Sequence, residues 1–571
     1  MLDELNHASE RLELALDQYL SVCTFIRDSC LRSGFHANDE LFYNSLKSEQ
    51  NKLLGHKRKL EEAQTAINVI RNTNPATNIN SLPPEILIRI FSLVIDNQLC
   101  LIHSHYPYPP GISRESNRIR FPDSLSYVCS SWRRLTINIP HFWSHIDIAL
   151  NHPLNPRLFE RAKVFITRSG NVPLEVHICD PCSRETPSSD GFISSPSYGN
   201  SPQKALTRDP KTLHNFRFLL SSPAPIKSLN LDLVFEDGFQ DYHVASLEYF
   251  LGNCTPEVLK CFSMQQRDFS YNHAQFIEPA DRPQTRSNRL LAIPSQDLEH
   301  LWLSTTILRL NGSCPPWSSQ AYHGLVELRL GDKVPDIRES QLVNILRLSP
   351  KLRVLHIKTT PQDSIPLDQT VEPVFLEDLE ELDINQESEI RYTHGDFLRW
   401  IVPGSKPLQL TFYGSPAKIG PPQFCARSKV TRFFLERYIL DSFVDMIRQS
   451  PWLEILAVNA DNFIPSNLGL ILPPIDQSYP EGLASTTRIN TLYLLKFSDL
   501  PFEDIQAAVH LYSVKHLMIR CTSISYETEE GRKVAEDPQE IKTKLSTLQP
   551  LPVIEYLDSH SPHEPEHWWY S

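Results

Sequence analysis

The apolar residues of the first 72 positions recur at helical spacing, which predicts two long helices. In the second of them Leu46, Leu53, Leu60 and Ile67 lie seven residues apart, the spacing of a coiled-coil seam. Gly34 falls between the two helices, where a helical hairpin would turn. A solitary hairpin buries little apolar surface, so its stripe is expected to pack on a further helix of this chain or of a second chain, or to support the next domain. The stripe of the first helix comprises Leu2, Leu5, Leu12, Leu16 and Leu20.

A short, very apolar segment follows a polar linker at residues 72–80. Pro83, Pro84 and Glu85 predict a helix over residues 84–96, because the first residues of a helix need no N–H partner and its positive end favours an acidic side chain. Large apolar residues lie nearly all round this helix. It is therefore expected to be covered on most sides, either by a neighbouring part of this chain or by a partner protein.

A second helical segment is predicted between Ser124 and Ile148. Its apolar residues follow helical spacing, and polar residues occupy the opposite side. Pro140 and the pair Phe142 and Trp143 are expected to end this helix. The apolar positions are Leu125, Val128, Cys129, Trp132 and Leu135.

A short motif, apolar-x-x-Leu-x-apolar, recurs through the rest of the chain. Its copies at Leu298, Leu325, Leu352 and Leu379 are separated by a constant step of 27 residues. This step and motif are typical of leucine-rich repeats, in which each unit contributes one strand to a parallel sheet. Less regular copies begin at Ile226, Leu453, Ile489 and Val514.

A longer internal correspondence supports the repeats. Residues 342–357 align without gaps on residues 443–458, and both segments predict a helix, a Ser-Pro turn and a strand. The leucines of the repeats are expected in the core, and the polar positions between them are expected on an exposed concave face. These positions are Glu299, Glu327, Arg329, Arg353, His356, Glu380 and Asp383. The acidic run from Leu376 to Glu389 is interpreted as a solvated edge, with attraction of a basic substrate as the alternative.

Composition and charge narrow the functional classes. A formal charge of -13 argues against nucleic-acid binding, which needs a basic face. The longest apolar stretch, within residues 81–98, is too short to span a bilayer, and the acidic amino-terminal residues do not resemble a secretory signal. The eleven scattered cysteines fit free thiols. We therefore expect a protein of the cytoplasm or nucleus without membrane or nucleic-acid partners.

Enzyme chemistry is not expected, because the chain lacks a phosphate-binding glycine loop, a dinucleotide-binding turn and a serine nucleophile elbow. Residues 563–567 match His-Glu-x-x-His, but Pro562 and Pro565 are incompatible with the helix that a zinc hydrolase needs. Cys179 and Cys182, preceded by His177, have the spacing of half a zinc site, and no second pair follows. No cofactor or metal is expected. Residues 186–202 predict a surface loop rich in serine and proline.

The two apolar helical segments together resemble an F-box. The family pattern begins with Leu-Pro-x-Glu, continues through Ile-Phe to Val-Cys-x-x-Trp-Arg-x-Leu, and ends in an aromatic residue followed by Trp. This chain departs from the pattern by an insertion at about residues 97–123. Residues 168–178 also look like the segment that follows the F-box in large fungal F-box families. The matching residues are Leu82, Pro83, Glu85, Ile86, Leu87, Ile90, Phe91, Val128, Cys129, Trp132, Arg133, Leu135, Phe142 and Trp143.

The resemblance implies a function. F-box proteins bind a Skp-type adaptor, which connects them to a cullin scaffold carrying a RING protein, and their other domain binds a protein substrate for ubiquitination. The apolar surplus of the first segment would then be an interface. The adaptor-binding residues implied by the resemblance are Leu82, Pro83, Ile86, Leu87, Ile90, Phe91, Val128, Cys129 and Trp132.

The expected fold combines α+β and α/β features. It comprises a helical hairpin or coiled coil at residues 1–72, a small all-helical F-box at 80–148, an irregular leucine-rich-repeat-like solenoid of parallel strands and helices at 160–548, and a carboxyl-terminal tail at 549–571. The expected function is substrate recognition for a cullin-RING ubiquitin ligase. The alternatives are a repeat scaffold with a degenerate F-box and a zinc hydrolase that uses the carboxyl-terminal histidines.

Overall fold

The computed structural model shows a mixed α/β protein with one long sheet. It divides into two compact units, each described by itself: unit 1 is Met1–Phe91 with Ser126–Arg134, and unit 2 is Ser92–Leu125 with Leu135–Ser571. The structure describes residues 2–32, 40–73, 79, 81–96, 122–149, 155–179, 224–235, 240–268, 275–281, 289–359, 361–363, 371–385, 396–413, 420–436, 442–460, 488–528 and 531–557.

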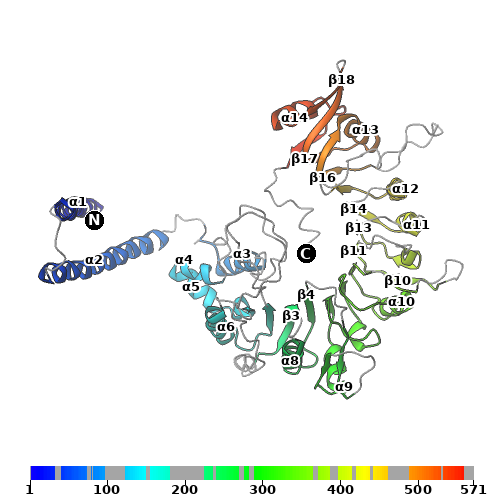
Figure 1. Cartoon of the computed structure of the whole chain (residues 1–571), viewed down its shortest axis with the longest axis horizontal. Coiled ribbons are helices and arrows are strands. Elements are labelled where there is room, and N and C mark those ends of the chain that lie inside the picture. The colour runs from blue at the N-terminus through cyan, green and yellow to red at the C-terminus, as the bar shows by residue number, and fades with distance from the viewer. Residues whose placement is uncertain are drawn as a thin grey trace, which may run out of the picture. The chain divides into compact units, whose positions relative to one another are not determined.

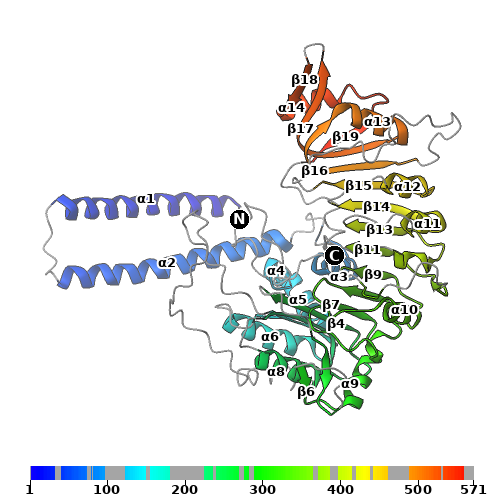
Figure 2. The same cartoon turned by 45° about the vertical axis from the view of Figure 1, so that its right-hand side comes forward.

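Unit 1 contains the two long helices predicted from the leucine spacing, α1 (Leu2–Arg32) and α2 (Glu40–Thr73). The two helices lie beside each other (Figure 2), and the Tyr19 hydroxyl donates a hydrogen bond to Glu49 Oε1 at 3.3 Å. Ion pairs one turn apart, such as Arg58 with Glu62 at 3.5 Å, support α2 from its solvent side. Gly34, where a turn was expected, lies outside the described residues.

The seam of α2 remains at the surface of unit 1. The side chains of Leu46, Leu53, Leu60 and Ile67 are each 40 to 50% exposed. The contact between α1 and α2 therefore covers this seam only in part. Whether a further helix or a second chain covers the remainder stays a prediction.

Unit 2 is built on a 15-stranded sheet (Figure 1). Its strands pair in parallel, except that the strand His516–Thr528 pairs in antiparallel with the strand Gly531–Ala535. Its strands are β1 (His145–Ala149), β2 (Leu174–Cys179), β3 (Ile226–Phe235), β4 (Cys261–Asp268), β7 (Ile307–Asn311), β8 (Glu327–Leu330), β9 (Val354–Ile357), β11 (Glu381–Asn385), β13 (Leu408–Tyr413), β14 (Val430–Glu436), β15 (Ile455–Asn459), β16 (Thr491–Pro501), β17 (His516–Thr528), β18 (Gly531–Ala535) and β19 (Val553–Tyr556). Two short parallel pairs, β5 (Ile277–Pro279) with β6 (Arg289–Leu291) and β10 (Val374–Leu376) with β12 (Ile401–Pro403), lie outside it.

Helices follow the strands on the outer face of this curved sheet, the arrangement of a solenoid (Figure 1). They are α6 (Asn155–Ser169), α8 (Gln240–Leu251), α9 (Ser295–Trp302), α10 (Glu339–Arg347), α11 (Gly420–Arg427), α12 (Ser442–Arg448) and α13 (Phe502–Tyr512). Helix α14 (Pro538–Leu545) follows β18, and the short 3-10 turns are η1 (Pro140–Trp143), η3 (Gln320–Tyr322) and η4 (Asp396–Arg399).

Most repeat copies form the strands that their motif predicts. The copies at Leu325, Leu352 and Leu379 give β8, β9 and β11, which pair in parallel with Glu327, Val354 and Glu381 side by side. The internal correspondence is also confirmed, since α10 with β9 and α12 with β15 are the same helix-turn-strand unit. The irregular copies at Ile226, Leu453, Ile489 and Val514 contain the starts of β3, β15, β16 and β17.

The prediction of a strand at Leu298 was wrong. This segment is helix α9, and its strand, β7, begins at Ile307. The apolar residues Leu298, Leu301 and Trp302 are buried at positions i, i+3 and i+4, which is helical spacing. Because Leu-x-x-Leu is common to both patterns, the motif alone did not separate a helix from a strand. The 27-residue step therefore holds for three strands and not for the first copy.

The core lies between the sheet and the outer helices. Alternate residues of each strand point to this layer and are almost fully buried, among them Leu308, Leu328, Leu355, Leu382 and Leu410. Their period of two leaves the intervening residues on the opposite, inner face. That inner face is the candidate recognition surface of unit 2.

The regular order of parallel strands stops at β17. Strand β17 pairs on its far side with β19 in parallel and with β18 in antiparallel, so the regular order stops there. Strand β18 is five residues long and carries Arg532 and Lys533. Among the described residues no helix is long and apolar enough to cross a membrane.

Candidate functional site

The first candidate surface is carried by three short helices: α3 (Pro84–Asp96), α4 (Asp123–Val128) and α5 (Ser130–Ile137). Helix α3 has the predicted bounds. It begins at Pro84, and the Pro83 carbonyl accepts the amide protons of Ile86 at 3.0 Å and Leu87 at 3.2 Å. The two prolines thus fix the start of the helix, as their position in the sequence indicated.

The second helical segment breaks into two helices at Cys129, where one was predicted. The Cys129 carbonyl accepts from the Arg133 amide at 2.9 Å, and the Trp132 amide donates to the Cys129 sulfur at 3.5 Å. Cys129 therefore caps the start of α5 with both its backbone and its side chain. Helical spacing of the apolar residues did not reveal this break, because the spacing continues across Cys129.

Phe91 and Trp132 join α3 to α5 within unit 1. Their ring centroids lie 4.6 Å apart at an interplanar angle of 57°. Phe91 is 1% exposed and Leu87 is 5% exposed, so these two side chains form the small core. Two of the residues expected to bind an adaptor are therefore covered in this structure.

The other residues of that set are more accessible. Ile86 is 48% exposed and Val128 is 52% exposed, and the neighbouring Tyr127 is 77% exposed. The structure thus leaves large apolar side chains of unit 1 at its surface. Half-buried members of the set are Leu82, Ile90, Cys129 and Trp132, and Pro83 is exposed.

Phe142 and Trp143, the last two matches to the motif, lie in the core of unit 2. The Trp143 ring meets the Phe165 ring edge-on at a centroid distance of 4.9 Å, and its Nε1 donates to the Thr136 carbonyl at 2.9 Å. The guanidinium of Arg168 lies 4.2 Å from the centre of the Trp143 ring. These aromatics fix the turn η1 against α6 and are not part of an exposed surface.

The second candidate surface is the inner face of the sheet in unit 2. Strand register aligns one residue from each strand into a continuous cross-strand series, here called the central row. It runs through Asp147, His177, Asn230, Ser263, Arg309, Arg329, His356, Asp383, Thr411, Phe434, Ala457, Tyr493 and Met518. The row is polar as far as Thr411 and apolar from Phe434 onward.

Ion pairs connect the charged residues of the polar part. Arg309 binds Glu327 through two hydrogen bonds, of 2.6 Å from Nε and 3.2 Å from a terminal nitrogen, and Arg329 Nε donates to the same carboxylate at 2.6 Å. Burial of Glu327 opposes its ionisation, but the hydrogen bond from Arg309 and the charge of Arg329 outweigh this cost and hold its pKa below the usual value.

A similar group surrounds His356. Its Nε2 lies 2.5 Å from Glu381 Oε1, and its Nδ1 lies 3.8 Å from Asp383 Oδ2. The pKa of Glu381 is lowered: burial would raise it, and the contact with His356 prevails. Burial dominates at Asp383 and raises the pKa of that carboxyl. Two acids beside one imidazole thus have pKa shifts in opposite directions.

The expectation that the polar repeat positions are exposed was wrong for three of them. Glu327, His356 and Asp383 are each 8% exposed or less, because they pair with charges on neighbouring strands. Glu299 lies on helix α9, where its carboxylate accepts from the Gln320 amide at 2.7 Å. Arg353 remains exposed and binds Glu380, so the acidic run from Leu376 is partly neutralised by basic partners.

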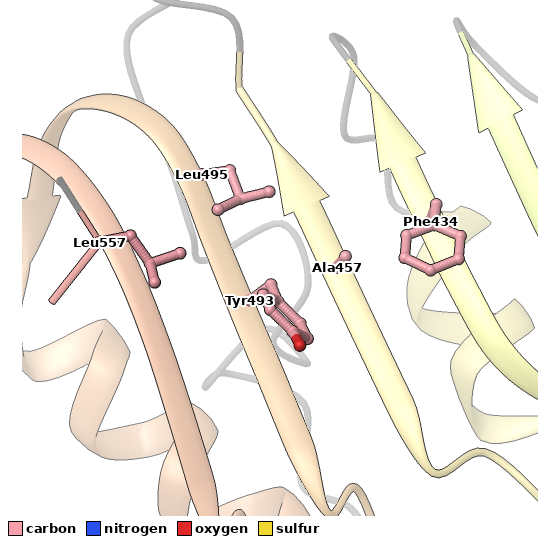
Figure 3. Packing of buried hydrophobic residues seen from close by; sticks show 5 residues of the cluster. All are labelled: Phe434, Ala457, Tyr493, Leu495 and Leu557. Carbon is pink, nitrogen blue, oxygen red and sulfur yellow. The ribbon is translucent and has the colours of Figure 1, made fainter. Parts of the chain in front are cut away.

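The apolar part of the inner face forms a second cluster, shown in Figure 3. Phe434, Ala457, Tyr493 and Leu495 come from β14, β15 and β16, and Leu557 follows β19. All five are at most 6% exposed, and Ile455 and Met518 pack against them. The alternation of apolar and polar residues along a strand did not reveal this cluster, because these three strands are apolar on both faces.

Among the described residues, one group brings three potential metal ligands together: His145, Asp147 and His177. Sequence reasoning identified only His177, through its spacing from Cys179. Cys182 and the histidines of residues 563–567 lie outside the described residues. A search of protein-family models gave no match to the chain.

Proposed function

We propose that this chain is the substrate-recognition subunit of a Skp-cullin-F-box ubiquitin ligase. In this proposal the helices α3, α4 and α5 bind a Skp-type adaptor, and the inner face of the sheet in unit 2 binds the protein substrate. The chain itself catalyses no step, and it raises the local concentration of substrate beside the conjugating enzyme.

One observation carries the proposal beyond the sequence motif. In a small unit whose core is Phe91, Leu87 and Trp132, the apolar side chains of Ile86 and Val128 remain about half exposed. Exposed apolar side chains that gather on short helices mark interaction surfaces in soluble proteins. The motif residues thus divide into a group that holds the helices together and a group that is available to a partner.

The inner face suits an extended protein segment. Its polar part carries Arg309 and Arg329 on the central row, with side chains that are 38% and 21% exposed, and the ion pair of Arg309 with Glu327 connects neighbouring strands. In this proposal a substrate would contact the two arginines through acidic side chains.

Co-purification of the full chain with a Skp-type adaptor tests the proposal. The exposed residues are changed singly, as Ile86→Glu and Val128→Glu, because substitutions there leave the core intact. Each is expected to weaken adaptor binding at least tenfold, the equivalent of about 1.4 kcal/mol. The double variant Leu82→Ala, Pro83→Ala tests the turn that precedes α3 and is expected to lose the adaptor as well.

A matched control is available in unit 2. Val164 on α6 is 45% exposed, so Val164→Glu places the same charge on a similarly exposed valine outside the proposed interface. This variant is expected to bind the adaptor like the wild type. Failure of well-folded wild-type protein to bind any adaptor would refute the proposal and leave a repeat scaffold as the function.

A further inference from the structure

A cluster of metal-ligand side chains lies at the first two strands of the sheet in unit 2. Asp147 and His177 are directly opposite each other in the register of β1 and β2, and His145 lies two residues before Asp147 on the same face. The ligand atoms of all three lie within 4.8 Å of one another. Hydrogen-bonded neighbouring strands hold these positions rigidly, as a binding site requires.

The distances centre on one carboxylate oxygen. Asp147 Oδ1 lies 3.0 Å from His145 Nε2 and 3.6 Å from His177 Nδ1. Two atoms bound to the same tetrahedral zinc ion lie roughly 3.2 to 3.5 Å apart, since each bond measures about 2.0 to 2.2 Å. The observed distances of 3.0 and 3.6 Å lie just below and just above this range, so small side-chain shifts would bring these atoms onto a shared ion. The contact with His177 is longer than a good hydrogen bond.

The surroundings match an outer shell of a metal site. Glu175 Oε2 lies 3.7 Å from His145 Nδ1, so a carboxylate faces the ring nitrogen that the ion would not use. Arg161 approaches the other oxygen of Asp147, Oδ2, at 3.9 Å and binds Asp123 through Nε at 2.9 Å. Arg161 therefore approaches one oxygen of Asp147, and His145 and His177 lie nearest to the other.

Charge and access also favour a cation. Three carboxylates, Asp147, Glu175 and Asp123, stand against two cations, Arg161 and Lys227, of which Lys227 lies 3.9 Å from Glu175. With neutral imidazoles the group is one negative charge in excess. The side chains of Asp147 and His177 are 6% and 3% exposed, and that of His145 is 44% exposed, which gives an ion a route from solvent.

The geometry points to a zinc site formed by His145, Asp147 and His177, which fastens the edge strand β1 to β2. The sequence contained part of this site in the spacing of His177 from the cysteines. Its other two ligands lie 30 and 32 residues earlier in the chain and become neighbours only through the strand register. Three protein ligands leave a fourth position of the ion open.

Zinc binding by the full chain, stripped of metal with a chelator, tests the site. Competition with a chromophoric chelator is expected to give one zinc ion per chain. The variants His145→Ala and Asp147→Asn should each weaken this affinity more than about 100-fold, because loss of an outer-shell partner alone costs about 10- to 100-fold. Glu175→Gln, an outer-shell change, should fall within that smaller range.

Controls separate this site from incidental chelation by histidine. His356 also lies between two carboxylates, but among the described residues it belongs to no group of three converging ligands, so His356→Gln is expected to leave zinc affinity unchanged. The double variant His563→Ala, His567→Ala should likewise retain the ion. His145 is half exposed, so its variant is expected to keep the wild-type melting temperature measured without metal. Absence of zinc binding in the wild type, or undiminished binding in His145→Ala and Asp147→Asn, would overturn the proposal.

Discussion

Phe91 and Trp132 meet at a centroid distance of 4.6 Å and form the contact that holds α3 against α5 within unit 1. The two residues belong to different halves of the sequence motif, and 41 positions separate them in the chain. Their contact makes both rings part of the packing between α3 and α5. It also separates residues that stabilise the helices from residues that remain accessible.

Phe91→Ala is expected to lower the free energy of unfolding of unit 1 by about 3 to 5 kcal/mol, because a large aromatic ring leaves a cavity in a small core. Hydrogen exchange of the α3 and α5 amides measures this loss locally. Ile86→Ala, on the same helix at a half-exposed position, should change it by no more than about 0.5 kcal/mol. Equal effects of the two variants would contradict this division of roles.

Acid should weaken unit 2 partly through Glu380. Hydrogen bonds from Arg353 and Lys406 lower the pKa of Glu380 from 4.5 to about 2. A carboxyl whose pKa is lower in the folded state contributes stability that is fully present above about pH 4.5 and is lost as the pH falls toward 2. In Glu380→Gln, thermal melting across this window should depend less steeply on pH than in the wild type, and an unchanged dependence would refute the assignment.

Two glycines should respond to alanine in opposite directions. A Cβ atom at Gly404 would lie 2.3 Å from the Glu377 carbonyl oxygen, so Gly404→Ala is expected to cost about 1 to 3 kcal/mol. Gly55, inside α2, has nothing within 4 Å of that position, and Gly55→Ala should stabilise the helix by about 0.5 to 1 kcal/mol. Calorimetric melting of both variants checks the signs, and destabilisation by Gly55→Ala would contradict the helix described for this segment.

Cysteine alkylation should follow burial. Burial raises the pKa of Cys254 and of Cys425 to about 12, so almost none of either thiol is ionised at pH 8. Cys23 on α1 is exposed. Iodoacetamide is expected to modify Cys23 in the native protein and to modify the two buried cysteines only after denaturation, as mass spectrometry of peptides would show. Modification of Cys425 without unfolding would mean that its part of the core opens readily.

The sequence was sufficient for features that depend on local periodicity. The leucine spacing of residues 1–72, the prolines before α3 and the motif copies at Leu325, Leu352 and Leu379 each predicted the observed element. Periodicity was insufficient at Leu298, because spacings of three and four residues suit a helix while the same leucines also satisfy the strand motif.

Features that depend on strand register were not predictable from one chain segment at a time. Glu327 and His356 were expected at the surface. They are buried instead, and charged residues on neighbouring strands pair with them. The same reason applies to His145 and Asp147, which come close to His177 only through the register of β1 and β2. Pairwise register is a long-range property, so it is absent from the local pattern of apolar and polar residues.

The short antiparallel strand β18 has a consequence for how copies of this protein meet in solution. A parallel sheet that stopped at a long, flat strand would offer unpaired backbone groups as a template for another molecule. Here β18 and β19 are five and four residues long, and β18 carries the charged side chains of Arg532, which binds Asp499, and of Lys533. Short edge strands with charged side chains disfavour pairing with another molecule. The sheet can therefore be long within one molecule without growing into a fibre of many.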